Sequence, residues 1–242
     1  MSNVWWILRR ELIHYLRSPI GYVIVTAALA IDGLWFNAVA VGNQARLSAQ
    51  VLAEFFNGAS GLTLLASLFI AMRLIAEERQ TGTLLLLTTS PIRDWQIILG
   101  KFLGALTLII VMNALTVYMP LLIMLNGKVS FGHMVAGYLG LTLLGGLALA
   151  VGMLCSALAP NQLIAVIVNA AILAVLVLLW LLSRIASPPI QDLLVYMSIH
   201  DKHFQPFMRG LVSIADVIFY VTATYVALLA AIRVLEARRW RA

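Results

Sequence analysis

The chain alternates between long apolar runs and short polar connections, and this alternation sets its fold class. A helix needs about 20 mostly apolar residues to cross a hydrocarbon core of roughly 30 Å, and six runs approach that length. The pattern predicts an all-α integral membrane protein with six transmembrane helices in a single domain, residues 1–242. The expected spans are 20–41, 61–76, 102–125, 134–158, 163–182 and 213–232, of which the second is short because of its polar ends.

An amphipathic pattern precedes the first span and predicts an N-terminal interfacial helix over residues 4–18. Apolar residues recur at spacings of three and four, with basic residues beside them. An ordinary positively charged flank of the first span is the alternative. The step at Ser18-Pro19 is expected to turn the chain into the bilayer. The candidate residues of this helix are Trp5, Arg9, Arg10, Glu11 and Tyr15.

Composition and charge place the chain in a membrane and give its orientation. Hydrophobic residues make up 62% of the chain and charged residues 11%, against about 25% charged in soluble domains. The net charge of +6 follows the membrane and does not indicate a nucleic-acid partner. Lys and Arg collect on the cytoplasmic side, so we expect a cytoplasmic (inner) membrane location with both termini in the cytoplasm. Eleven basic residues flank the termini's side (9, 10, 17, 73, 79, 93, 101, 233, 238, 239, 241) and five the other (46, 128, 184, 202, 209).

The polar stretch between the second and third spans is the main functional candidate. Gly82 supplies a break, and Ser90-Pro91 suits the start of a new helix. The leucines between them are costly to leave in water, so the pattern predicts a cytoplasmic coupling helix covered by a partner or by the membrane surface. A loop tucked against its own bundle is the alternative. The candidate residues are Glu77, Glu78, Arg79, Gly82, Thr83, Leu84, Leu86, Ser90 and Pro91.

Three stretches carry a family resemblance: Arg10-Glu-Leu12 through Ile20, Glu78-Arg-Gln-Thr-Gly-Thr-Leu84 through Phe102, and His203-Phe-Gln-Pro-Phe207 through Tyr220. They resemble the membrane permeases of ABC-2-type ATP-binding cassette transporters, particularly those associated with gliding motility and with copper-enzyme maturation. The resemblance implies that the N-terminal helix and the coupling helix dock onto a separate ABC ATPase subunit. It also implies that a second permease copy, or a related permease, completes the transport path within the membrane lipid.

One position departs from the family pattern. Many relatives have an acid after Gly-Thr-Leu, where this chain has Leu85. The ATPase contact is therefore expected to be apolar or to come from Glu77 or Glu78.

No catalytic constellation is found, so this chain is not expected to be an enzyme. A Walker A loop needs Gly-x-x-x-x-Gly-Lys-Ser/Thr, but Gly100-Lys101 and Gly127-Lys128 are followed by Phe and Val. We expect no cofactor on this chain, with ATP and magnesium on the partner subunit. One cysteine and the pair His200-x-x-His203, without a clear third ligand, give no expected metal site.

Polar and small residues inside the spans are the remaining candidates. Asp32 is an acid inside the hydrocarbon, which is a functional hypothesis by default because its burial is costly; Asn113 and Asn169 could partner it. A place near the outer surface or a wet cavity is the alternative to a proton relay. Glycines of the fourth span and Gly100-x-x-x-Gly104 favour close helix contact, with packing within the chain preferred for the fourth span over a homodimer seam. The connection 183–212 is expected to form a short amphipathic helix that dips into the outer leaflet as a lid.

These observations predict the permease subunit of an ABC-2 transporter, coupling ATP hydrolysis by a separate ATPase to export or to force transmission. Two alternatives remain open. One is an ion-coupled secondary transporter that uses Asp32, and the other is a non-transporting membrane anchor of a motility or secretion machine.

Overall fold

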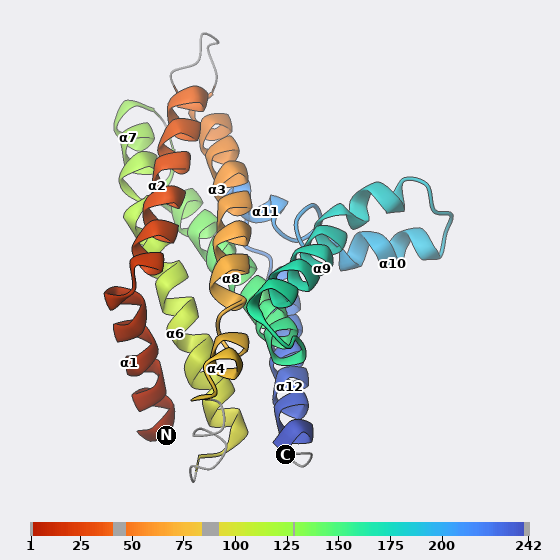
Figure 1. The fold of residues 1–242 in the computed structure, drawn as a ribbon. Coiled ribbons are helices and arrows are strands. Elements are labelled where there is room, and N and C mark those ends of the chain that lie inside the picture. The colour runs from red at the N-terminus through yellow and green to blue at the C-terminus, as the bar shows by residue number, and fades with distance from the viewer. Residues whose placement is uncertain (1, 41–46, 84–91, 128, 240–242) are drawn as a thin grey trace.

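The computed structural model describes residues 2–40, 47–83, 92–127 and 129–239. Within these ranges the chain is helical and contains no strand (Figure 1). The helices are α1 (Ser2–Arg17), α2 (Pro19–Ala40), α3 (Ser48–Ala71), α4 (Ala76–Gln80), α6 (Asp94–Leu115), α7 (Tyr118–Asn126), α8 (Phe131–Leu158), α9 (Gln162–Ser183), α10 (Ile190–Met197), α11 (Gln205–Met208) and α12 (Ile214–Arg239).

Six helical segments of the described chain are long and apolar enough to cross a membrane, which confirms the expected all-α membrane fold. They are Gly21–Ala38, Ser48–Gln80, Asp94–Leu125, Phe131–Leu158, Gln162–Ser183 and Ile214–Arg238. The first and last described residues lie at the same end of the bundle, which we call the terminal end; the opposite end is the far end (Figure 1).

The second span begins earlier than its apolar pattern indicates, at Ser48 rather than at Gly61. Polar residues such as Glu54 lower the hydropathy of its first half. Phe55 and Phe56 are nevertheless fully buried there, and the Phe56 ring packs over Gly137 of α8. Burial of these aromatic side chains against α8 therefore sets where the helix begins.

The fourth span, α8, is the packing centre of the bundle. A Cβ added to Gly137, Gly140, Gly145 or Gly152 would meet atoms of other helices of the same chain at 2.2 to 2.9 Å. Such close approach is what small residues permit at membrane helix interfaces. The preference for packing within the chain at this span is confirmed.

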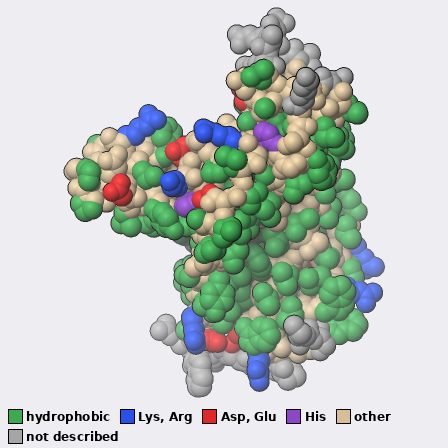
Figure 2. Space-filling model, turned by 180° about the vertical axis from the view of Figure 1, so that it is seen from behind, with side chains coloured by type: hydrophobic (Ala, Val, Ile, Leu, Met, Phe, Trp, Pro, Cys, Tyr) green, Lys and Arg blue, Asp and Glu red, His purple; other side chains and the backbone are tan. Residues whose placement is uncertain are grey.

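Helices α9 and α10 form an arm that projects to one side of the bundle (Figure 1). The expected short helix is present as α10, whose Ile190, Leu193 and Tyr196 side chains are exposed. Apolar side chains cover the body of the molecule, whereas charged side chains lie on the arm and toward the terminal end (Figure 2). Insertion of α10 into the outer leaflet remains a prediction.

A helix, α1, occupies the expected N-terminal range, and one of its faces is buried against the bundle. Ile7, Glu11 and Tyr15 are buried, while Trp5 and Leu16 are about 62% exposed. The reason is that α1 packs along the first half of α6, where Gly100 and Gly104 admit its side chains. The exposed tryptophan suits a membrane surface, where this residue type is enriched.

The close contact of α1 with α6 predicts opposite effects for two matched glycine substitutions. A Cβ at Gly104 would lie 2.8 Å from the Glu11 Cβ, whereas a Cβ at Gly61 would have no atom within 4 Å. Gly104→Ala should destabilise the protein by about 1–3 kcal/mol through overpacking. Gly61→Ala should be neutral or slightly stabilising, because Ala is the better helix former. Thermal unfolding in detergent measures both, and equal shifts of Tm would contradict this packing.

Candidate coupling site

Four charged side chains from three helices meet at the terminal end, and we call them the ion-pair cluster: Arg10, Glu11, Glu78 and Lys101. The Lys101 Nζ lies 2.6 Å from the Glu11 Oε1 and 2.9 Å from the Glu78 Oε1. The Arg10 Nη2 lies 2.7 Å from the same Glu78 oxygen. The cluster therefore joins α1, α4 and α6 through two positive and two negative groups.

Because two of its side chains are buried, the charges of this cluster need each other as partners. The Lys101 side chain is 3% exposed and that of Glu11 9%, so neither group is hydrated well enough to stand alone. Removing one partner from a buried ion pair leaves an uncompensated charge. The position of α1 is consequently tied to α4 and α6 by charge as well as by packing.

A cavity of about 340 Å³, lined largely by charged and polar residues, adjoins the cluster between α1, α4 and α6. The Arg73 guanidinium donates to both Glu77 oxygens at 2.6 and 2.8 Å on one side of it. Tyr15 also lines the cavity, and burial raises the pKa of its hydroxyl above the ordinary value. The Arg73–Glu77 pair and the ion-pair cluster are both formed within the chain, an arrangement that suits mechanical linkage.

Some of the predicted coupling residues lie in the described part of the chain and others lie outside it. Glu77 and Glu78 pair within the chain, with Arg73 for the first and with Arg10 and Lys101 for the second. Gly82 adopts a φ of 73°, a left-handed conformation that ends the helix and confirms the predicted break. The predicted residues Leu84, Leu86, Ser90 and Pro91 lie outside the described residues.

Thr83 lies just after the break. Its hydroxyl donates to the Glu78 carbonyl at 3.4 Å. Its role in the predicted coupling helix stays a prediction.

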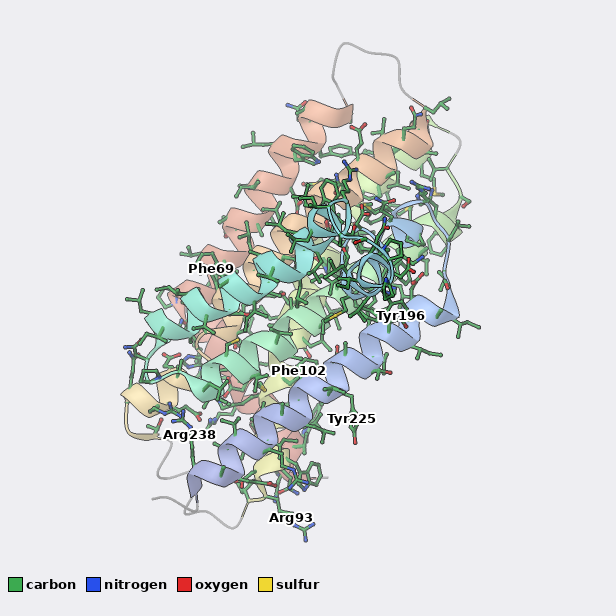
Figure 3. The ribbon with its side chains drawn as sticks, turned by 90° about the vertical axis from the view of Figure 1, so that its right-hand side faces the viewer. Phe69, Arg93, Phe102, Tyr196, Tyr225 and Arg238 are labelled. Atoms are coloured by element: carbon green, nitrogen blue, oxygen red, sulfur yellow. The ribbon has the colours of Figure 1, made fainter. Side chains whose placement is uncertain are left out.

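Arg79 points away from the ion-pair cluster and reaches the end of α8. Its guanidinium donates to the carbonyls of Ala157, at 3.1 Å, and of Ala159. Arg238 of α12 donates to the Leu158 carbonyl at 2.7 Å, and Figure 3 shows Arg238 at the terminal end. We call this arrangement the α8 cap, since the last carbonyls of a helix lack partners within it.

The polar residues inside the spans are buried, but they do not pair as expected. Asp32 is 3% exposed, and its Oδ1 has no hydrogen-bond partner among the described residues. Asn113 accepts a hydrogen bond from the Thr63 hydroxyl at 3.3 Å. Asn169 packs instead against Gly152, so neither amide is hydrogen bonded to Asp32. Asp32 is buried within the bundle, and its role stays a prediction.

At the far end, His203 joins α10 to α12. Its Nδ1 lies 2.7 Å from the Asp216 Oδ1 and its Nε2 lies 2.9 Å from the Tyr196 carbonyl. The imidazole also stacks on Phe219 at 3.8 Å. Both ring nitrogens are thus engaged, and no group of three potential metal ligands occurs in the described ranges.

Sequence reasoning missed the two residues that organise this site, Lys101 and Ser156. Lys101 was counted as a cytoplasmic flanking charge, whereas it is buried in the cluster. Its place between Gly100 and Gly104 was the available signal, since small residues on both sides indicate a helix packed closely over that face. Ser156, which bonds the start of α4, carries no comparable signal.

The burial of Lys101 predicts a large loss of stability when it is removed. Lys101→Met leaves two carboxylates to Arg10 alone and should cost about 3–5 kcal/mol, the range for breaking a buried pair. Adding Glu11→Met should restore part of this, because the pair is then replaced by apolar groups. The measurement is unfolding of the purified protein by denaturant or heat.

Arg233→Met is the matched control, because its pair with Glu236 is largely exposed and worth about 0–1 kcal/mol. Equal losses for Lys101→Met and Arg233→Met would show that the cluster is not a structural anchor.

His200 predicts a pH dependence of stability at the far end. The Ser60 hydroxyl donates to the Asn57 carbonyl at 2.6 Å, so the His200 Nε2, 2.9 Å away, must be the donor to Ser60. Burial lowers the pKa of His200, so folding favours its neutral form. The stability that it contributes is present above its unfolded pKa of about 6.5 and is lost as the pH falls below that value.

The stability of the protein should therefore decline between about pH 7 and pH 5, and His200→Gln, which keeps a donor for Ser60, should decline less. Identical pH profiles of Tm would contradict this assignment.

Comparison with known proteins gives the family. Residues 24–235 match the profile described as ABC-2 family transporter protein. The probable ABC transporter permease protein NosY of Pseudomonas aeruginosa is 37% identical over 107 residues, which are 43% of this chain and 39% of that relative. The protein of the same name from Stutzerimonas stutzeri is 36% identical over 107 residues, with the same coverage. The chain thus matches less than half the length of these curated relatives. Since the family profile covers most of the chain, this multi-pass membrane protein belongs to the ABC-2 family of transporter permeases.

Proposed function

We propose that this permease couples ATP hydrolysis by a separate ATPase subunit to export or to force transmission across the cytoplasmic membrane. ATP and magnesium would bind to the partner subunit. The permease would work as a pair, with a second copy or a related permease supplying the other six spans. Both termini, and with them the terminal end, would face the cytoplasm, which agrees with eleven basic residues on that side against five.

The observation that carries the proposal is the ion-pair cluster. The two elements expected to meet the ATPase are α1 and the segment that follows α4. The cluster ties α1, and also α4 at the start of that segment, to the third span. A push that reaches α1 or α4 would therefore be passed to the third span. An ATPase seated at the terminal end could act on the bundle through this one connection.

The pairing of Glu77 and Glu78 supports an apolar contact with the ATPase. Both carboxylates already have partners within the chain, and the Glu78 Oε2, which has no partner among the described residues, is buried. A new pair with the ATPase would therefore have to break an existing pair or expose this buried oxygen. The leucines 84–87 of the sequence are the remaining candidates. We propose that Leu84 and Leu86 enter an apolar groove of the ATPase.

Asp32 favours a second candidate function, an ion-coupled transporter. A buried carboxylate in a membrane span is expected to have a functional partner, and its Oδ1 has none among the described residues. Under this alternative, transport would depend on proton concentration and on Asp32. It would not require an ATPase.

The test is co-purification of the ATPase from the native membrane. Leu84→Asp with Leu86→Asp should abolish co-purification, because unpaired carboxylates in an apolar groove cost several kcal/mol. The permease should still be present in the membrane at its normal level. Leu47→Asp is the matched control, because Leu47 is an exposed leucine immediately before α3, and α3 begins at the far end (Figure 1). This variant should leave co-purification unchanged.

Unchanged ATPase recovery with the double variant would exclude this segment as the contact. Recovery of no ATPase with the unaltered protein, together with proton-dependent transport lost in Asp32→Asn, would favour the ion-coupled alternative.

A further inference from the structure

The helix α4 is only five residues long, yet two adjacent residues on it contact different parts of the bundle. Glu78 lies within reach of Arg10 of α1 and Lys101 of α6. Arg79 donates to the last carbonyls of α8. These contacts place α4 between two groups of helices, α1 with α6 on one side and α8 with α12 on the other.

The α-helical pattern is interrupted between α3 and α4. The helical hydrogen-bonding pattern of α3 ends at Ala71, and a turn over residues 72–75 separates it from α4. Backbone hydrogen bonds within this turn join the Arg73 N–H to the Ile70 carbonyl and the Leu74 N–H to the Ala71 carbonyl. Contacts with other helices hold α4 in addition to this backbone connection.

Ser156 of α8 supplies one such contact. Its hydroxyl oxygen accepts hydrogen bonds from the Ile75 and Ala76 N–H groups, at 3.1 and 2.9 Å. Its hydroxyl group donates to the Met72 carbonyl at 3.2 Å. Backbone groups at the turn between α3 and α4 are thus hydrogen bonded to Ser156 of α8, a different spanning helix. These bonds attach the beginning of α4 to α8.

Arg79 supplies the second contact with α8. A planar guanidinium holds two acceptors in a fixed geometry, and a cation is favoured at a helix C-terminus by the helix dipole. Arg238 holds the neighbouring Leu158 carbonyl from α12. The α8 cap consequently links three elements, α4, α8 and α12, at one point.

We infer that Arg79 is a positioning residue that transmits the displacement of α4 to α8 and α12, while Glu78 transmits it separately to α1 and α6. The inference rests on the proposed function, because it names the route by which an ATPase would move the spans. It assigns the two adjacent residues Glu78 and Arg79 to two different branches. One branch leads to the N-terminal helix, and the other leads to the packing centre of the bundle.

The first experiment needs no ATPase and measures the two branches in the permease alone. Spin labels at Gln80→Cys and Leu158→Cys report the distance from α4 to α8, and labels at Gln80→Cys and Arg9→Cys report that from α4 to α1. The three labelled positions are suited to this, because their side chains are exposed. The buried Cys155 is replaced by Ala so that it does not take up label. Pulsed electron spin resonance gives each distance distribution.

Arg79→Gln should broaden the α4–α8 distribution and leave the α4–α1 distribution unchanged. Glu78→Gln should have the reverse effect. Arg233→Gln, which removes a largely exposed guanidinium from α12, should change neither. The inference is overturned if Arg79→Gln broadens both distributions, neither of them, or only the α4–α1 distribution.

The second experiment adds ATP to the permease in complex with its ATPase. Arg79→Gln should remove the ATP-dependent shift of labels on α8 while retaining the shift on α1 and the recovery of the ATPase. Failure of the unaltered protein to bind an ATPase would refute the proposed function but leave the two branches, measured without it, in place. Loss of the shifts on α1 and α8 together in Arg79→Gln would contradict separate branches.

Discussion

The contact of Lys101 with Glu11 and Glu78 is the constraint on which the terminal end of this permease depends. A buried ammonium group requires nearby carboxylates, because its hydration has been lost. The carboxylates come from α1 and α4, two elements that the sequence places 90 and 23 positions away. Neither helix can move far without leaving the buried Lys101 ammonium group short of a carboxylate partner. The pairing therefore fixes two short helices on the third span, and the arrangement of the remaining site follows from this.

The glycines of α6 and α8 make that arrangement possible. Gly100 and Gly104 allow α1 to approach α6 closely enough for Glu11 to reach Lys101. Those of α8 admit Phe56 and Phe207, which bring α3 and α11 against the centre. In a membrane, close packing and hydrogen bonding supply the association between helices that the hydrophobic effect supplies in water. Ion pairs thus hold the helices together at the terminal end, and close packing holds them together at the centre of the bundle.

The sequence predicted the elements of this fold better than it predicted their contacts. Six apolar runs were sufficient for six spans, because hydrophobicity over about 20 residues is a local property. The start of the second span was missed, since Glu54 lowers the local hydropathy while Phe55 and Phe56 are buried by α8, a distant part of the chain.

The candidate site shows the same limit. Glu78 and Arg79 were identified from the sequence, but their partners Lys101 and Ala157 were not. Pairs between distant residues depend on how the helices are arranged, which no local pattern specifies. The break at Gly82 was predictable because glycine readily adopts a positive φ.

The most direct test of the central claim is the structure, by electron cryomicroscopy, of this permease purified with its partners from the native membrane. The account predicts an ATPase at the terminal end, in contact with α1 and with the segment that joins α4 to α6. It also predicts that the pairs of Lys101 with Glu11 and Glu78 are intact in that complex. An ATPase bound elsewhere, or a transport-competent permease without any ATPase, would contradict the account.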